Sequence, residues 1–124
     1  LARPMFGWLR FARRTMAEVE RQLETLPTRD VARLSCRDHG IVYLAEDAAE
    51  AVRMSDDYAP EHLELHVAGA AYFVQNLCNY GSLFIGEETT VAYGDPTIGT
   101  NPLLPTSRSA RYTGGLWVGQ FLKT

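Results

Sequence analysis

The fold class is decided by residues 63–86, which read LELHVAGAAYFVQNLCNYGSLFIG. Apolar and polar side chains alternate over residues 63–67, as they do in a half-buried strand. A helix is expected over residues 69–79, where one helical face carries Ala70, Phe73, Val74 and Leu77. Residues 82–86 favour a second strand, since they contain the apolar run Leu-Phe-Ile and are bounded by Gly81 and Gly86. The stretch therefore predicts two parallel strands joined by a helical crossover.

The same alternation of helix and strand extends toward the N-terminus. A first helix is expected over residues 16–26, ended by Pro27, and a second over residues 28–40. Residues 41–44, Ile-Val-Tyr-Leu, predict a buried strand because β-branched and aromatic residues favour strands. A third helix should end before Pro60. The order predicts an α/β fold of three-layer type, in which flanking helices cover a parallel or mixed sheet of more than three strands.

Length and composition exclude several classes of protein. The 124 residues fit one domain, and 46% hydrophobic with 22% charged residues excludes disorder and coiled coil. The net charge of −3 disfavours nucleic acid as a partner, because no basic surplus displaces phosphate counterions. No apolar run approaches a membrane span, and no signal peptide is recognisable. We therefore expect a cytoplasmic protein without a membrane partner, in which Cys36 and Cys78 stay reduced and pack as small hydrophobes.

The two ends of the chain differ from the middle. Residues 1–11 form an Arg-rich segment without acidic residues, whereas 12 of the 15 carboxylates lie between residues 18 and 64. We therefore expect the domain to span residues 12–124. The N-terminal segment is interpreted either as a helix that covers an exposed face, as a membrane-surface helix, or as sequence unrelated to the domain. Residues 87–113 predict a long loop rich in glycine and proline, followed by an apolar cluster of Leu116, Trp117, Val118, Phe121 and Leu122.

Glu61 and His62 are the strongest candidates for chemistry. No dinucleotide-binding, P-loop, serine-hydrolase or zincin motif occurs, and His62 follows a carboxylate that comes directly after a proline, in Ala-Pro-Glu-His. Adjacent glutamate and histidine can move protons near neutral pH, although both could be ordinary surface residues. His66 follows His62 by four residues, but on a strand the two would be ~13 Å apart, which disfavours a metal pair. Asp95, taken by itself, is typical of a turn.

Four motifs occur along the chain: DYAPEHLEL at residues 57–65, YGSLFIG at 80–86, Gly94-Asp95 followed by GTNPLLPT at 99–106, and ARY at 110–112. Together they closely resemble histidinol dehydrogenases, over residues 12–124. The ending ARYTGGLWVG at 110–119 is more similar to the branch of that family that acts on sulfopropanediol-type alcohols than to the enzymes of histidine biosynthesis.

The resemblance implies an oxidoreductase that oxidises a small amino-alcohol or sulfonated alcohol through an aldehyde to a carboxylate, with NAD and zinc. In the family, the residue that matches His62 acts as general base, and the residue that matches Glu61 helps activate water. Asp95 matches a position that ligates zinc. Family enzymes are homodimers with sites shared between subunits, so the resemblance also implies a homodimer or higher oligomer.

This sequence departs from the family in its length and at one site position. It resembles the later half of the main α/β domain, so the cofactor-binding region and the other zinc ligands are missing, and Pro102 replaces a substrate-contacting histidine. One carboxylate does not hold zinc with useful affinity. We therefore expect a fragment that binds neither zinc nor NAD stably, has no cofactor-binding residues and does not turn over alone. The alternative is a non-catalytic dimerisation or binding module, because losing part of the sheet exposes apolar side chains.

Overall fold

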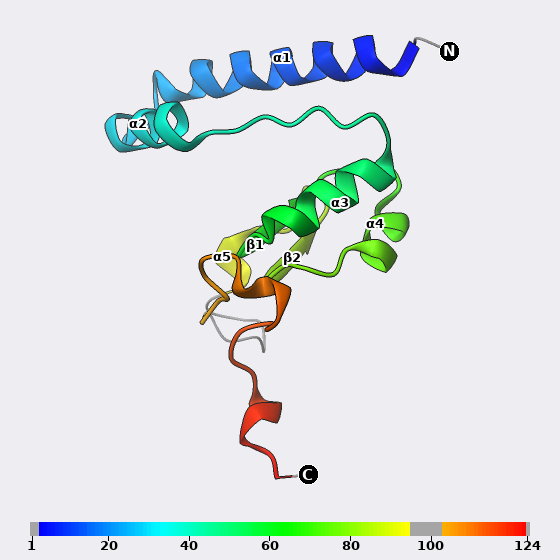
Figure 1. Cartoon of the computed structure of the whole chain (residues 1–124). Helices are drawn as coiled ribbons and strands as arrows, with labels where there is room; N and C mark the ends of the chain where they lie inside the picture. Colours follow the sequence, from blue (N-terminus) through cyan, green and yellow to red (C-terminus); the bar gives the residue numbers. More distant parts are fainter. Residues whose placement is uncertain (1–2, 95–102, 124) are drawn as a thin grey trace. The chain divides into compact units, whose positions relative to one another are not determined.

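The computed structural model describes residues 3–94 and 103–123, drawn in Figure 1. The chain divides into two compact units, Leu1–Asp47 and Ala48–Thr124. Unit 1 is helical, whereas unit 2 combines helices with a small parallel sheet. This combination is compatible with the predicted α/β class, and the three-layer arrangement remains a prediction.

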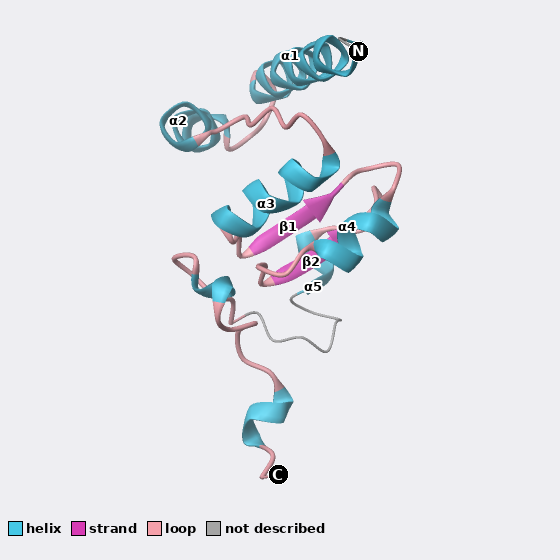
Figure 2. Ribbon diagram, turned by 45° about the vertical axis from the view of Figure 1, so that its right-hand side comes forward, coloured by secondary structure: helices cyan, strands magenta, loops and turns pink. Residues whose placement is uncertain are grey.

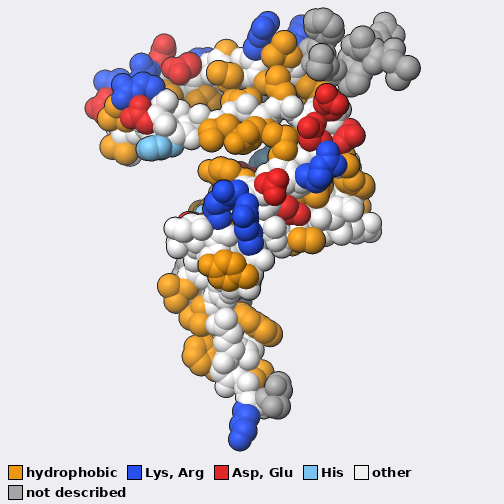
Figure 3. Space-filling view, viewed as in Figure 1, with side chains coloured by type: hydrophobic (Ala, Val, Ile, Leu, Met, Phe, Trp, Pro, Cys, Tyr) orange, Lys and Arg blue, Asp and Glu red, His pale blue; other side chains and the backbone are white. Residues whose placement is uncertain are grey.

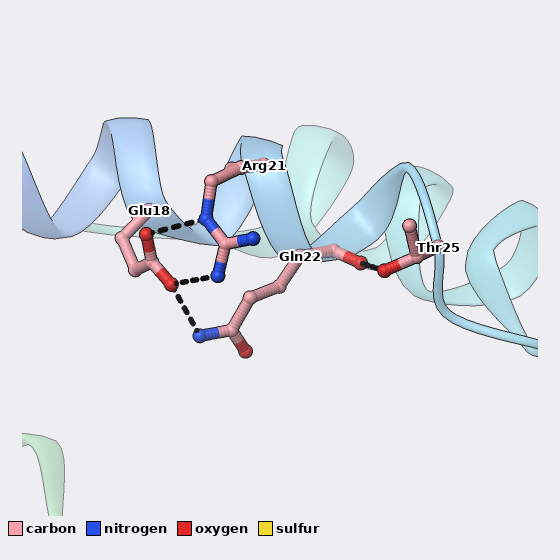
Figure 4. Close-up of polar contacts among 4 residues, drawn as sticks. All are labelled: Glu18, Arg21, Gln22 and Thr25. Atoms are coloured by element: carbon pink, nitrogen blue, oxygen red, sulfur yellow. Dashed lines mark hydrogen bonds and ion pairs between the residues drawn. The ribbon is translucent and has the colours of Figure 1, made fainter.

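Unit 1 begins with α1, which spans Arg3–Leu23 and is longer than the predicted helix over residues 16–26. The arginines upstream of residue 16 are good helix formers, so the helix extends through them. Near its C-terminal end, both Nε and Nη2 of Arg21 donate hydrogen bonds to the Glu18 carboxylate, at 2.8 and 2.6 Å, and Gln22 donates a third at 2.9 Å (Figure 4). These contacts stabilise the last turns of α1 on its solvent side.

The second helix, α2, spans Arg29–His39 and confirms the helix predicted over residues 28–40. Its first turn is closed by the backbone, because the amides of Val31 and Ala32 donate to the Thr28 carbonyl, and the Thr28 side chain makes no capping hydrogen bond. Cys36 lies on this helix with an exposed side chain, so the prediction that it packs as a small hydrophobe is wrong.

The strand predicted over residues 41–44 is also wrong. These residues have no regular secondary structure and belong to no sheet, and their side chains are between 47 and 60% exposed. Strand propensity reflects how a side chain fits a pleated surface, and it does not supply the neighbouring strand that a ladder needs. Within the described part of unit 1, the segment has no backbone hydrogen-bond partner.

Unit 2 contains the strand, helix and strand that the sequence predicts (Figure 2). The elements run in the order α3 (Ala48–Tyr58), β1 (His62–Leu65), α4 (Ala70–Asn76), β2 (Ser82–Ile85) and α5 (Val91–Gly94). The strands are parallel, with His62 opposite Ser82 and Leu65 opposite Ile85. Among the described residues the sheet has two strands, fewer than predicted. Its core is small and consists of Val52, Ala59, Leu65, Leu77, Phe84 and Ala110.

Asp56 connects α3 to the turn that precedes β2. Its Oδ1 accepts hydrogen bonds from the backbone amides of Cys78, at 3.0 Å, and Asn79, at 2.9 Å. The Asn79 side chain returns a hydrogen bond to the Asp56 carbonyl at 3.1 Å. Cys78 lies beyond the end of α4 and is exposed, contrary to the expectation that it packs on a helix.

The loop predicted over residues 87–113 contains two short helical segments, α5 and the 3-10 turn η1 (Ser109–Arg111), and part of it lies outside the described residues. The apolar cluster that follows forms η2 (Val118–Phe121) and stays exposed; Figure 3 shows apolar side chains along this C-terminal segment. No helix within the described ranges is both long and apolar enough to cross a bilayer.

Candidate functional site

The Glu61-His62 pair lies where the chain leaves α3 and enters β1. The helix ends at Tyr58, and Ala59 reverses the chain with a positive φ of 52° while its side chain is only 1% exposed. A residue other than glycine in this conformation costs free energy and persists only where its surroundings hold it. Pro60 then restricts the backbone before Glu61. Ala59 and Pro60 form a turn between α3 and β1, called the corner below, and this corner fixes where the backbone of Glu61 and His62 lies.

Backbone contacts with Gly81 and Ser82 fix the position of Glu61. The Gly81 amide donates to the Pro60 carbonyl at 3.0 Å, and the Ser82 amide donates to the Glu61 carbonyl at 2.8 Å. A Cβ atom at Gly81 would lie 2.5 Å from the Glu61 oxygen and 2.7 Å from Cδ of Pro105. Only glycine therefore fits between these two neighbours. The sequence does not predict this role of Gly81, because such a close approach leaves no local signal.

His62 is the first residue of β1 and has an exposed side chain, whereas Glu61 is half-buried. The imidazole lies next to the buried Phe84 ring, with 6.1 Å between ring centroids and 31° between their planes. An apolar ring on one side and solvent on the other leave the ring nitrogens accessible to a substrate. This arrangement allows His62 to accept a proton from a bound hydroxyl group.

Two arginines that sequence reasoning did not assign to the site lie at the end of α3. Nη2 of Arg108 and Nη2 of Arg111 both donate to the backbone carbonyl of Asp57. Figure 2 shows the segment with η1 beside the C-terminal end of α3. Arg111 belongs to the ARY motif, but its contact with a residue 54 positions away cannot be found from spacing.

The described residues do not contain a set of side chains that could form the zinc site. Asp95, the predicted zinc ligand, and Pro102 lie outside them. In the ranges 3–94 and 103–123, no three His, Cys, Asp or Glu side chains lie close enough together to share a metal ion. His66 follows β1, and its Nε2 lies 3.4 Å from Oε2 of Glu64. Since zinc sites use at least three protein ligands, the described residues do not fit zinc.

Comparisons with known proteins agree with the motifs. A family model described as histidinol dehydrogenase matches residues 9–124. A histidinol dehydrogenase homolog of Shouchella clausii is 54% identical over 114 residues, which cover 92% of this chain and 27% of that protein. A Pelagibacter ubique homolog is 50% identical over 115 residues, covering 91% of this chain and 27% of the relative.

A relative with a different name is the sulfopropanediol 3-dehydrogenase of Ruegeria pomeroyi. It is 42% identical over 125 residues, which cover 94% of this chain and 28% of the relative. The chain thus spans about a quarter of the length of the curated relatives it matches.

Proposed function

Because this chain belongs to the histidinol dehydrogenase family, we propose that it contributes the proton-transferring pair Glu61 and His62 to the oxidation of a small alcohol. The observation that carries the proposal is the placement of this pair, within the matched range, at a corner held by Ala59 and Gly81. General acid-base catalysis requires such positioning, because a proton moves only between groups within hydrogen-bond reach.

Each side chain has a distinct role in this proposal. His62, as a neutral imidazole, accepts the proton of the substrate hydroxyl while the alcohol is oxidised to an aldehyde, and the hydride that leaves the carbon would pass to NAD. Glu61 polarises the water molecule that attacks the aldehyde on the way to the carboxylate. The family implies NAD and zinc, and the zinc would be held by residues other than the described ones, since those do not fit a metal.

The substrate is proposed to be a small amino-alcohol or a sulfonated alcohol. Relatives named histidinol dehydrogenase and sulfopropanediol 3-dehydrogenase support these two classes. We place the reaction in the cytoplasm, in keeping with the two free cysteines of the described residues.

The first test uses the 124-residue chain alone. It is mixed with zinc, NAD and either histidinol or sulfopropanediol, and NADH formation is followed by absorbance. We expect no turnover, because the described residues provide no metal site. Steady NADH formation by the chain alone would show that the metal and cofactor are held by these residues after all.

The second test places the segment in a longer protein. In a chimera, residues 9–124 replace the matching segment of the Ruegeria pomeroyi sulfopropanediol 3-dehydrogenase. We expect the chimera to form NADH from sulfopropanediol, since the proposal holds that this segment is competent for proton transfer. A folded chimera without activity would contradict the proposal.

A second candidate function is a non-catalytic module that associates with itself. The observation in its favour is the apolar C-terminal segment, where Trp117, Val118 and Phe121 are 62, 71 and 75% exposed. Exposed apolar patches of this kind mark interaction surfaces. The partner that we propose is a second copy of this chain, in a homodimer or higher oligomer. Proton transfer and self-association are compatible in one chain.

A further inference from the structure

Arg108 and Arg111 converge on one backbone oxygen, the Asp57 carbonyl. Arg108 is the residue before the η1 turn and Arg111 is the last residue of that turn. Both side chains are exposed. Their guanidinium groups are therefore close neighbours at the surface of unit 2.

The contact with Asp57 does not balance the charge of this pair. A carbonyl oxygen is neutral, and the partial negative charge of about 0.5 at the end of a helix offsets only part of two positive charges. Among the described residues, neither guanidinium forms an ion pair with a carboxylate. Each also retains N–H donors beyond the Nη2 group that the carbonyl uses. Two cations with spare donors, side by side, favour an anion between them.

The backbone that carries the pair is held in unit 2 and leads back to the turn that carries Glu61. Ala110, between the two arginines, is buried in the core of unit 2. Ser107 and Arg108 have positive φ values of 53° and 65°, a costly conformation for residues other than glycine. Upstream, Pro105 packs at Gly81 beside the Glu61 carbonyl. The same loop thus connects the arginine pair to the corner that carries Glu61.

We propose that Arg108 and Arg111 bind the anionic headgroup, a sulfonate or a carboxylate, of the alcohol substrate. The inference rests on the proposed function in that it names the substrate class of the same site. Two guanidinium groups recognise such a headgroup through charge-assisted hydrogen bonds, while the hydroxyl end of a short substrate extends toward Glu61 and His62.

The test measures binding to the 124-residue chain by NMR, through the side-chain N–H signals of its arginines. The probes are 2,3-dihydroxypropane-1-sulfonate, glycerate and glycerol, at constant ionic strength. We expect saturable binding of one or both anions, with shifts of the Arg108 and Arg111 signals, and none for glycerol. Arg108→Gln and Arg111→Gln should each weaken binding about tenfold, the loss expected for a charge-assisted hydrogen bond.

The matched control is Arg53→Gln, which removes an equal charge from the exposed face of α3 and should leave binding unchanged. Circular dichroism checks that each variant is folded. If a glutamine variant is unfolded, Arg108→Lys gives a second measurement, because lysine keeps the charge but lacks the planar guanidinium group. The absence of saturable anion binding, or equal losses in the control and the two variants, would overturn the proposal.

Turnover of the chimera separates this proposal from the proposed function. If the chimera is active and the arginine variants leave its KM unchanged, the anion site is wrong and the proton-transfer role stands. If the chimera is inactive but the chain binds the anions through the arginine pair, the anion site stands and the proton-transfer role is wrong.

Discussion

Asp56 shows how one side chain shapes the candidate site from outside it. Its carboxylate accepts two backbone amides of the turn before β2, and that turn leads directly to Gly81 and Ser82, which hold Glu61. The sequence shows two adjacent aspartates, Asp56 and Asp57, without distinguishing them. In the structure the first holds the fold together through its side chain and the second accepts the arginine pair through its backbone.

We expect Asp56→Ala to lower the free energy of unfolding of unit 2 by about 1–3 kcal/mol, because two backbone amides lose their acceptor. Asp57→Ala, the matched control, changes the neighbouring residue of the same helix and should have a much smaller effect. Denaturant unfolding followed by circular dichroism checks both. Equal destabilisation by the two substitutions would show that the Asp56 hydrogen bonds contribute nothing specific.

Glu18 gives a prediction for pH. Hydrogen bonds from Arg21, and then from Gln22, lower the pKa of the Glu18 carboxyl from 4.5 to about 2. A carboxyl whose pKa is lowered in the folded state stabilises that state above the unfolded pKa, and the stabilisation is lost as the pH falls from about 4.5 to about 2.

The corresponding measurement is helix content by circular dichroism, recorded from pH 6 downward at low salt. The wild-type chain should lose more helix over this pH interval than Glu18→Gln, in which the titrating group is missing. Because both side chains of the pair are exposed, added salt should reduce the difference. Superimposable pH profiles for the two chains would contradict this role of Glu18.

Glu61 and His62 can be predicted as site residues from the sequence because their chemistry and their neighbours are local, and their role stays a prediction. Arg108 and Arg111 cannot be predicted in this way, because they contact Asp57, which lies 51 and 54 positions away. Asp95 remains a prediction, since it lies outside the described residues. Residues whose function depends on long-range contacts leave no trace in local spacing.

At the scale of elements, the sequence predicts those that local patterns determine. The helix α3, the strands β1 and β2 and their parallel pairing follow from apolar periodicity and from Pro60. Residues 41–44 carry an equally clear strand pattern but remain unpaired among the described residues, because a strand needs a neighbour that its own sequence does not encode. The boundary predicted at residue 12 also remains a prediction.

Gly81→Ala tests the junction between β1, β2 and the C-terminal loop. The new Cβ would lie 2.5 Å from the Glu61 carbonyl and 2.7 Å from Pro105, so one of these neighbours must move. We expect the free energy of unfolding to fall by about 1–3 kcal/mol, as for other overpacked sites. Gly114→Ala is the control, because a Cβ there meets nothing within 4 Å. Equal unfolding midpoints for the two variants would show that the junction is not closely packed.

At the scale of the whole molecule, much apolar surface stays exposed in both units, including Trp8, Phe11, Trp117 and Phe121. We expect the chain to associate at tens of micromolar, as judged by light scattering. Trp117→Ser together with Phe121→Ser should reduce the association, because the apolar area available for burial falls. A monomer at the same concentration would contradict the proposed oligomer.

The central claim is that His62 transfers the proton in the alcohol oxidation, and kcat of the active chimera tests it most directly. We predict that His62→Ala lowers kcat by about 10²- to 10⁴-fold, the range for loss of a general base, and destabilises the fold by less than about 2 kcal/mol. His66→Ala, the matched control, should leave kcat unchanged. An unchanged kcat in the folded His62→Ala chimera would contradict the account.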